Sequence, residues 1–253
     1  MHQKTEDGIT YCVNSLHTLI KMTNEGERRD VIIPRFLRDG TRIDSLGECF
    51  CKGPYRKLFI SEEIKEVQQK AFHAADAEEV YWNPAFLSIP DYCFAHSKVQ
   101  NIYNIDKVVR IGEGAFFKSN IKAFAVPDSC NKLPNSCFAF SSLRVISNTE
   151  KLISIEPRAF SNTNLLEFIW PSKCYEIPAS CFAGCTLERI SNINHVTLIG
   201  NYAFYDTERL QKMDLSNSMV SVVGKGAFFG FQRDEVEFPY YMETKHIKHA
   251  FDD

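Results

Sequence analysis

Apolar residues return along this chain at a fixed period. A small residue followed by phenylalanine recurs every 22 residues through the centre of the chain, and we call these phenylalanines anchors. After seven intervals of 22 residues, the next interval is 24 and the last is 23. Self-similarity at such a period predicts a solenoid, in which each coil buries its apolar residues against neighbouring coils. The anchors are Phe50, Phe72, Phe94, Phe116, Phe138, Phe160, Phe182, Phe204, Phe228 and Phe251.

Further apolar columns keep register with the anchors. Around Phe116 they are illustrated by Ile111, five residues before it, and by Ile121 and Phe124, five and eight residues after it. Residues six to ten after each anchor alternate, which predicts a short strand with the eighth and tenth residues inward and the seventh and ninth outward. The segment that leads into each anchor predicts a corner made by a single helical turn. Trp82 and Trp170, at the tenth position, are therefore expected in the core.

Residues 61–72 favour two different structures. Taken alone, they resemble a helix that begins at Ser61. Val67 and Phe72, however, stand in register with the repeat columns, and we expect this register to prevail over the local helix propensity.

The ends of the chain depart from the repeat. Residues 1–48 contain three short apolar runs, at 9–13, 17–22 and 31–34, with a turn signal at 24–26. A solenoid must cover the open end of its first coil, so 1–48 is predicted to be an N-terminal β-hairpin-like cap. Residues 49–253 are predicted to form about ten coils. Because the sequence stops just past Phe251, we expect no C-terminal cap.

A second period of 44 residues is superimposed on the first. The residue before the anchor alternates between Cys and Ala, with cysteine at Cys49, Cys93, Cys137 and Cys181. Equivalent cysteines are then two coils apart, about 10 Å for coils stacked at strand spacing, which is too far for a disulfide. We interpret them as small buried hydrophobic residues. Asparagine follows only the Cys-type anchors by ten residues, and we expect Asn104, Asn148 and Asn192 to point inward and bond backbone groups.

Composition excludes several classes of function. The net charge is −3, and no run of about 18 apolar residues occurs, so we expect neither a nucleic-acid partner nor membrane insertion. The first residues lack the apolar segment of a signal peptide. No phosphate loop, nucleophile elbow or zinc-protease motif is present, which predicts no cofactor and no enzyme. His246 and His249 have a helical metal-site spacing but no partner ligands nearby in sequence, so no metal site is expected.

One outward column contains a candidate binding surface. At the ninth position after successive anchors stand Phe59, Tyr81 and Tyr103, flanked two residues earlier by Lys57, Glu79 and Asn101. Exposed aromatic side chains often anchor protein partners. The same column also fits an aromatic ladder that stabilises the sheet or docks the N-terminal cap. Both interpretations remain open from the sequence.

The repeat unit resembles the BspA-like leucine-rich repeats of bacterial and protozoan surface proteins. The matching residues include Ile121, Phe124, Val126-Pro127, Ile111-Gly112 and Ala115-Phe116. The resemblance spans about residues 43–251. It implies a leucine-rich-repeat solenoid, a β-rich right-handed coil of short strands and single helical turns, and a surface protein that adheres to host or matrix proteins.

The sequence therefore predicts a non-enzymatic, protein-binding repeat scaffold that binds through its strand face, of adhesin or surface-antigen type. The alternative is an intracellular assembly module that associates with itself through its C-terminal coil. The resemblance favours the cell surface, whereas the lack of a recognisable signal segment fits a cytoplasmic protein equally well.

Overall fold

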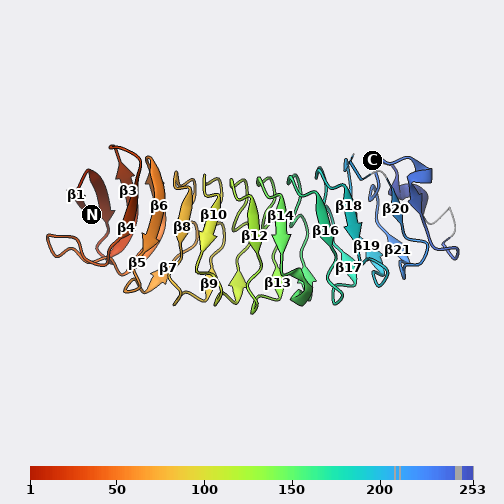
Figure 1. Ribbon diagram of the computed structural model, residues 1–253, viewed down its shortest axis with the longest axis horizontal. Helices are drawn as coiled ribbons and strands as arrows, with labels where there is room; N and C mark the ends of the chain where they lie inside the picture. The colour runs from red at the N-terminus through yellow and green to blue at the C-terminus, as the bar shows by residue number, and fades with distance from the viewer. Residues whose placement is uncertain (208, 211, 243–246, 253) are drawn as a thin grey trace. The chain divides into compact units, whose positions relative to one another are not determined.

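The computed structural model describes residues 1–207, 209–210, 212–242 and 247–252, without the side chains of Cys49 and Phe50. It divides the chain into two compact units. The N-terminal unit contains Met1–Lys122 and Pro127–Ser129, and the C-terminal unit contains Ala123–Val126 and Cys130–Asp253. Each unit is a stack of short strands joined by tight turns, with almost no helix, as Figure 1 shows. The predicted β-solenoid fold is confirmed.

The N-terminal unit contains a five-stranded sheet in the order β1-β2-β3-β5-β7 and a four-stranded sheet in the order β10-β8-β6-β4. The unit also contains a separate two-stranded ladder of β9 and β11. The strands are β1 (His2–Glu6), β2 (Ile9–Val13), β3 (Thr18–Asn24), β4 (Arg29–Ile33), β5 (Ser45–Lys52), β6 (Tyr55–Ile60), β7 (Glu66–Val67), β8 (Glu79–Tyr81), β9 (Ser88–Ile89), β10 (Asn101–Tyr103) and β11 (Arg110–Ile111).

The C-terminal unit is built from small parallel ladders, β12-β14, β13-β15, β16-β18, β17-β19-β21 and β20-β22. Its elements are β12 (Ala123–Ala125), β13 (Lys132–Leu133), β14 (Val145–Ser147), η1 (Thr149–Lys151), β15 (Ser154–Ile155), β16 (Glu167–Ile169), β17 (Glu176–Ile177), β18 (Arg189–Ser191), β19 (Leu198–Ile199), β20 (Met213–Asp214), β21 (Val222–Val223), η2 (Arg233–Glu235), β22 (Val236–Glu237) and η3 (Lys248–Ala250).

The anchors form the core of each unit as a stack of parallel rings. In the N-terminal unit the rings of Phe94 and Phe116 lie 5.5 Å apart at an interplanar angle of 5°. In the C-terminal unit Phe160 and Phe182 lie 5.6 Å apart at 13°. The Phe94 amide also donates to the Ala115 carbonyl at 2.7 Å, and this bond recurs at other anchors. Such close backbone approach explains why only Ala or Cys precedes the anchor.

The corner at the anchors from Phe72 to Phe228 is not the predicted helical turn, whereas the 3-10 turn η3 leads into Phe251 as predicted. Around Phe94, amides bond to carbonyls three residues back at alternate positions, from Cys93 to Pro90 and from Ala95 to Tyr92. Tyr92 and His96, two residues on either side of Phe94, have φ of 53° and 59°. A left-handed residue on each side reverses the chain twice and is incompatible with a continuous helix. The repeat contains two tight turns at this position.

On one face of the C-terminal unit, strand pairing follows the 44-residue period. On the strand face of the C-terminal unit, β12 pairs with β14 and β16 pairs with β18, whereas no described ladder joins β14 to β16. The predicted inward orientation of the asparagines is wrong, because Asn148 and Asn192 are exposed and left-handed, with φ of 59° and 60°. The predicted bond to the backbone is present at Asn192, whose side-chain amide donates to the Trp170 carbonyl at 2.7 Å. Asn104 is likewise exposed, with φ of 63°. Asparagine tolerates this conformation better than other non-glycine residues, and it ends these strands.

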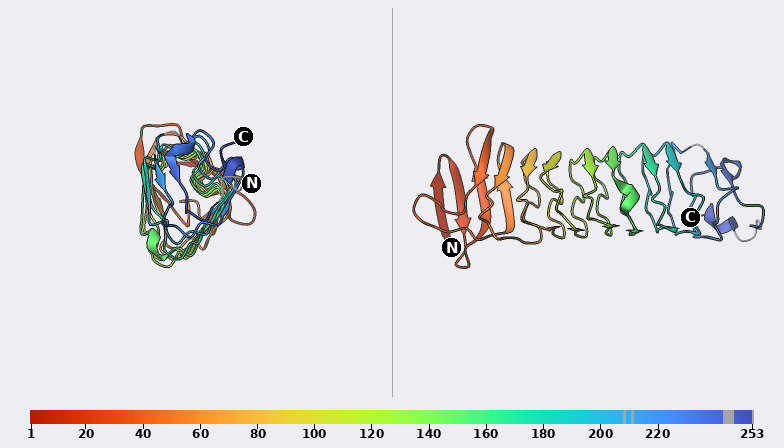
Figure 2. Two further views of the ribbon diagram at one scale, coloured as in Figure 1. Left: turned by 90° about the vertical axis from the view of Figure 1, so that its right-hand side faces the viewer. Right: turned by 60° about the horizontal axis from the view of Figure 1, so that its bottom comes forward.

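The N-terminal segment contains the longest strands. β1, β2 and β3 pair antiparallel, whereas β3 and β4 pair in parallel with β5 and β6 (Figure 2). The backbone of Phe50 lies within β5, opposite Lys21, and not in a corner like the later anchors. No helix forms at 61–72, where β7 keeps the repeat register. The boundary at residue 48 remains a proposal.

The buried residues follow the predicted columns. Trp82 and Trp170 are fully buried. Cys93, Cys137 and Cys181 are also fully buried and free, and burial raises the pKa of each thiol far above its ordinary value. Their predicted role as small core residues is confirmed. The side chains of Cys49 and Phe50, and the whole of His246, lie outside the described part of the chain.

Candidate functional site

The three predicted aromatic residues form one continuous stack in the N-terminal unit. Parallel pairing places Phe59 opposite Tyr81 and Tyr81 opposite Tyr103. The rings of Phe59 and Tyr81 lie 4.3 Å apart at 21°, and those of Tyr81 and Tyr103 lie 4.7 Å apart at 25°. Phe59 and Tyr81 are half-buried by this stacking, whereas Tyr103 is 39% exposed. We call these residues the aromatic strip.

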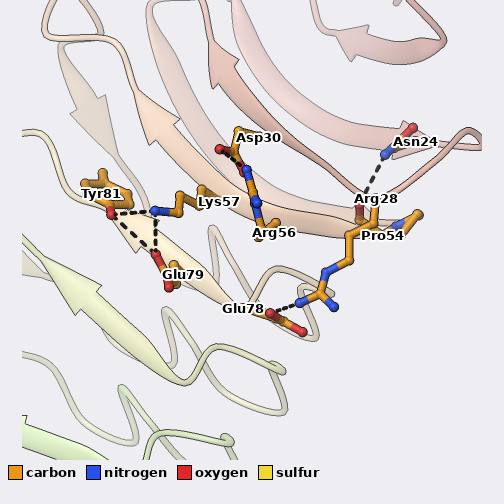
Figure 3. A network of polar contacts seen from close by, with 9 residues as sticks. All are labelled: Asn24, Arg28, Asp30, Pro54, Arg56, Lys57, Glu78, Glu79 and Tyr81. Carbon is orange, nitrogen blue, oxygen red and sulfur yellow. Dashed lines mark hydrogen bonds and ion pairs between the residues drawn. The ribbon is translucent and has the colours of Figure 1, made fainter.

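Charged side chains fix the middle of the aromatic strip. The Lys57 ammonium donates to the Tyr81 hydroxyl at 3.3 Å and lies 3.4 Å from the Glu79 carboxylate. The Tyr81 hydroxyl donates to the same carboxylate at 3.3 Å (Figure 3). The hydrogen bond to Tyr81 and the charge of Glu79 raise the pKa of Lys57. The triad holds the Tyr81 ring at a fixed position.

Two further ion pairs cross the same sheet. Arg56 forms a bidentate pair with Asp30, through Nε–Oδ1 at 2.7 Å and Nη2–Oδ2 at 2.8 Å. The hydrogen bond from Arg56 lowers the pKa of the Asp30 carboxyl. Arg28 pairs with Glu78 beside it (Figure 3). These contacts link β4, β6 and the coil of β8, so the aromatic strip lies on a cross-braced sheet.

The structure brings all six predicted residues onto one sheet face and adds a seventh. Asn101 lies opposite Glu79 in the ladder of β8 and β10. Ile32, which the sequence analysis did not single out, lies opposite Phe59 and is 63% exposed. It continues the column of the aromatic strip on β4. The apolar run Val31-Ile32-Ile33 was the available signal, but residues 1–48 were interpreted as lying outside the repeat.

The equivalent column of the C-terminal unit has a different chemistry. Its residues are Ala125, Ser147, Ile169 and Ser191, all exposed. Here the ion pair between Arg189 and Glu167, at 3.4 Å, joins β16 to β18 beside Ile169. No aromatic ring occupies this column in the described residues of the unit.

The described residues contain no group of three or more His, Cys, Asp or Glu side chains placed to hold a metal ion. In the same residues, no helix has the length and apolar character needed to cross a membrane.

Stacks of short parallel strands joined by tight turns, with an apolar spine in each unit, are typical of a leucine-rich-repeat protein. The family model of the BspA-type leucine-rich repeat region, with six copies, matches residues 65–189 and 175–252. The chain therefore belongs to the BspA-type leucine-rich repeat family, which confirms the resemblance found in the sequence.

Several solved structures are similar to this chain, and the first of them supports the fold. The chain is 20% identical to a leucine-rich cell surface protein of Faecalibacterium prausnitzii, covering 94% of this chain and 77% of that chain with a TM-score of 0.60. It is 15% identical to the pneumococcal vaccine antigen PcpA, covering 91% of this chain and 79% of that chain at a TM-score of 0.47. A leucine-rich-repeat protein from Bacteroides ovatus is also 15% identical to this chain. The match covers 99% of this chain and 97% of that chain, with a TM-score of 0.44. No curated protein matches the chain.

Proposed function

We propose that this protein is a non-enzymatic binding scaffold of the adhesin or surface-antigen type, and that its partner is a protein docked on the aromatic strip. The observation that carries the proposal is the stack of Phe59, Tyr81 and Tyr103 on a solvent-facing sheet. A partial precedent is the cell surface protein of F. prausnitzii, whose fold this chain shares.

The physical advantage of the aromatic strip is its low ordering cost. Its rings are already stacked, and Tyr81 is held by Lys57 and Glu79, so a partner immobilises little that was free. Tyrosine combines an apolar ring with a polar hydroxyl and is enriched among residues that dominate protein interfaces. Tyr103 ends the stack and is the most exposed of the three rings, so it is the expected centre of the contact.

Stacking also stabilises the sheet, and one experiment separates the two roles. Tyr103→Ser removes the most exposed ring and leaves Phe59 stacked on Tyr81. Val109→Ser is the matched control, because Val109 is an exposed apolar residue, at 49%, of the same unit, outside the aromatic strip. Each protein is immobilised and titrated with a panel of purified extracellular matrix glycoproteins.

We expect at least one matrix protein to bind the wild type and the Val109→Ser variant, and to bind Tyr103→Ser at least tenfold more weakly. Equal binding by all three proteins would show that the aromatic strip only stabilises the fold. Binding by none of them would contradict the adhesin assignment.

A second candidate is self-association through the C-terminal coil. Tyr240, between β22 and η3, is 98% exposed and packs edge to face against Tyr241 at 5.7 Å. Sedimentation velocity over a hundredfold range of concentration tests this candidate. Self-association predicts a rising sedimentation coefficient that Tyr240→Ser abolishes, whereas a constant monomer value contradicts it.

A further inference from the structure

A groove opens on the strand face of the C-terminal unit, away from the aromatic strip in sequence and distinct in chemistry. Its volume is about 680 Å³, within the range of sites that hold small ligands or short peptides. Its apolar lining comes from Val145 on β14, from Ile169 on β16 and from Leu166, which directly precedes β16. These side chains are 59%, 39% and 67% exposed, so they form an uncovered apolar surface.

A local substitution in the repeat helps to open this groove. The residue after the left-handed asparagine is a buried isoleucine in two other Cys-type coils, Ile105 and Ile193. In the coil of β14 the same position holds Thr149, which is smaller and only half-buried and lines the groove. The repeat thus loses apolar volume at one position beside β16.

Backbone groups at the floor of the groove are not used by the sheet. Ser147 accepts a hydrogen bond from the Val126 amide at 3.0 Å, which turns Ser147 toward β12. Alternate residues of a strand turn their amides to opposite sides, so Ile146 faces β16. On β16, the Trp170 amide bonds to Ser191 of β18 at 2.9 Å, and Ile169 therefore faces β14. No backbone–backbone hydrogen bond of the described chain joins β14 to β16, and the Ile169 carbonyl accepts only a long bond, at 3.5 Å, from the Thr149 hydroxyl among the described residues.

Charged side chains surround the groove, and two of them lie at its opposite ends. Glu167 and Glu188 are paired with Arg189 and Arg209, at 3.4 Å and 3.3 Å. Arg144 precedes β14 and Glu150 lies in η1, past its other end. Both are exposed, and neither forms an ion pair with a described residue. One unpaired cation and one unpaired anion therefore stand at opposite ends of an apolar floor.

We propose that this groove binds an extended protein segment of about four to six residues, with an acidic side chain at one end and a basic side chain at the other. The acidic residue pairs with Arg144 and the basic residue with Glu150. Aliphatic side chains between them cover Val145 and Ile169, and the segment's backbone bonds the open groups of Ile146 and the open amide of Ile169. This site is independent of the aromatic strip.

Blocked, fluorescently labelled hexapeptides test the proposal. The probe has the sequence Glu-Ser-Val-Ser-Val-Lys, and its analogues have Glu at both ends, Lys at both ends or Gln at both ends. Wild-type protein is expected to bind the Glu/Lys probe at least fivefold more tightly than any analogue in fluorescence anisotropy titrations. Raising the salt concentration should reduce that preference, since both contacts are exposed ion pairs.

Charge variants locate the site and the direction of the preference. Arg144→Glu should shift the preference to the peptide with Lys at both ends, and Glu150→Lys to the peptide with Glu at both ends. Ile169→Ser should weaken the binding of all peptides at least fivefold, whereas Ile153→Ser, at an exposed residue outside the groove, should not. Tyr103→Ser should also have no effect.

Two results would overturn the proposal. The first is wild-type binding that does not distinguish the Glu/Lys probe from the Gln peptide. The second is a preference that Arg144→Glu and Glu150→Lys leave unchanged, with circular dichroism showing both variants folded.

Discussion

The strand faces of the two units are built on the same coil but have different surfaces. In the N-terminal unit the ninth position after the anchor carries the rings of Phe59, Tyr81 and Tyr103. In the C-terminal unit it carries Ala125, Ser147, Ile169 and Ser191. The inward positions of both units hold the same apolar types, because stacking neighbours must bury them. The coil therefore fixes the core column by column, whereas the outward columns are free to differ.

Loss of an anchor ring should cause the largest destabilisation, and it should do so equally in both units. Phe94→Ala and Phe160→Ala each remove a fully buried ring that is stacked against neighbouring anchors. Each should lower the free energy of unfolding by about 3–5 kcal/mol. Urea denaturation followed by circular dichroism measures both. A loss below about 1 kcal/mol in one unit alone would show that the anchors of that unit are not its core.

Replacing a buried cysteine should destabilise both units equally, and by less than the loss of an anchor ring. Cys93→Ser and Cys137→Ser place a hydroxyl in a fully buried slot and should cost about 1–3 kcal/mol each. The alanine variants are the control, since alanine occupies this slot in alternate coils, and should cost less than the serine variants. Serine variants as stable as the alanine variants would contradict an apolar slot.

Substitutions at the ninth position after the anchor should destabilise the N-terminal unit more than the C-terminal unit. Tyr81→Ser removes a ring stacked on both sides and should cost about 1–2 kcal/mol. Ile169→Ser, at the equivalent position of the C-terminal unit, is 67% exposed and should cost less than about 0.5 kcal/mol. Thermal melts of the two variants, measured side by side, provide the comparison. Equal losses would mean that the aromatic strip adds nothing to the stability of its sheet.

The smallest effect concerns the corners. Ala74 and Arg158, two residues from their anchors, have φ of 53° and 58°. Glycine adopts this conformation without steric cost, although it also loses more entropy on folding. Ala74→Gly and Arg158→Gly should therefore each stabilise their unit by about 0.5 kcal/mol, whereas Arg158→Val should destabilise it. A destabilising glycine variant would argue against the left-handed corner.

The sequence predicted those features that repeat. The 22-residue spacing placed the anchors, the buried cysteines and the outward column of Phe59, Tyr81 and Tyr103 correctly, because each is fixed by contacts between equivalent residues. It also correctly rejected a helix at 61–72 in favour of β7.

Features that depend on backbone conformation were missed. The left-handed residues beside each anchor include Tyr92, Lys118 and Phe140, whose side chains give no sign of a positive φ. The asparagines were predicted to bond backbone groups through their side chains, which Asn192 does, whereas Asn104 and Asn148 end a strand through their positive φ. The groove at Thr149 depends on one missing isoleucine and on two strands that do not pair, and neither appears in a column of apolar residues.

The central claim is that partners dock on the aromatic strip, and amide hydrogen exchange tests it most directly. Exchange is measured in the protein alone and with a saturating matrix protein from the panel. Binding on the aromatic strip predicts slower exchange in β6, β8 and β10, with the C-terminal unit unchanged. Protection confined to β14 to β18, or to any other part of the chain, would contradict the claim.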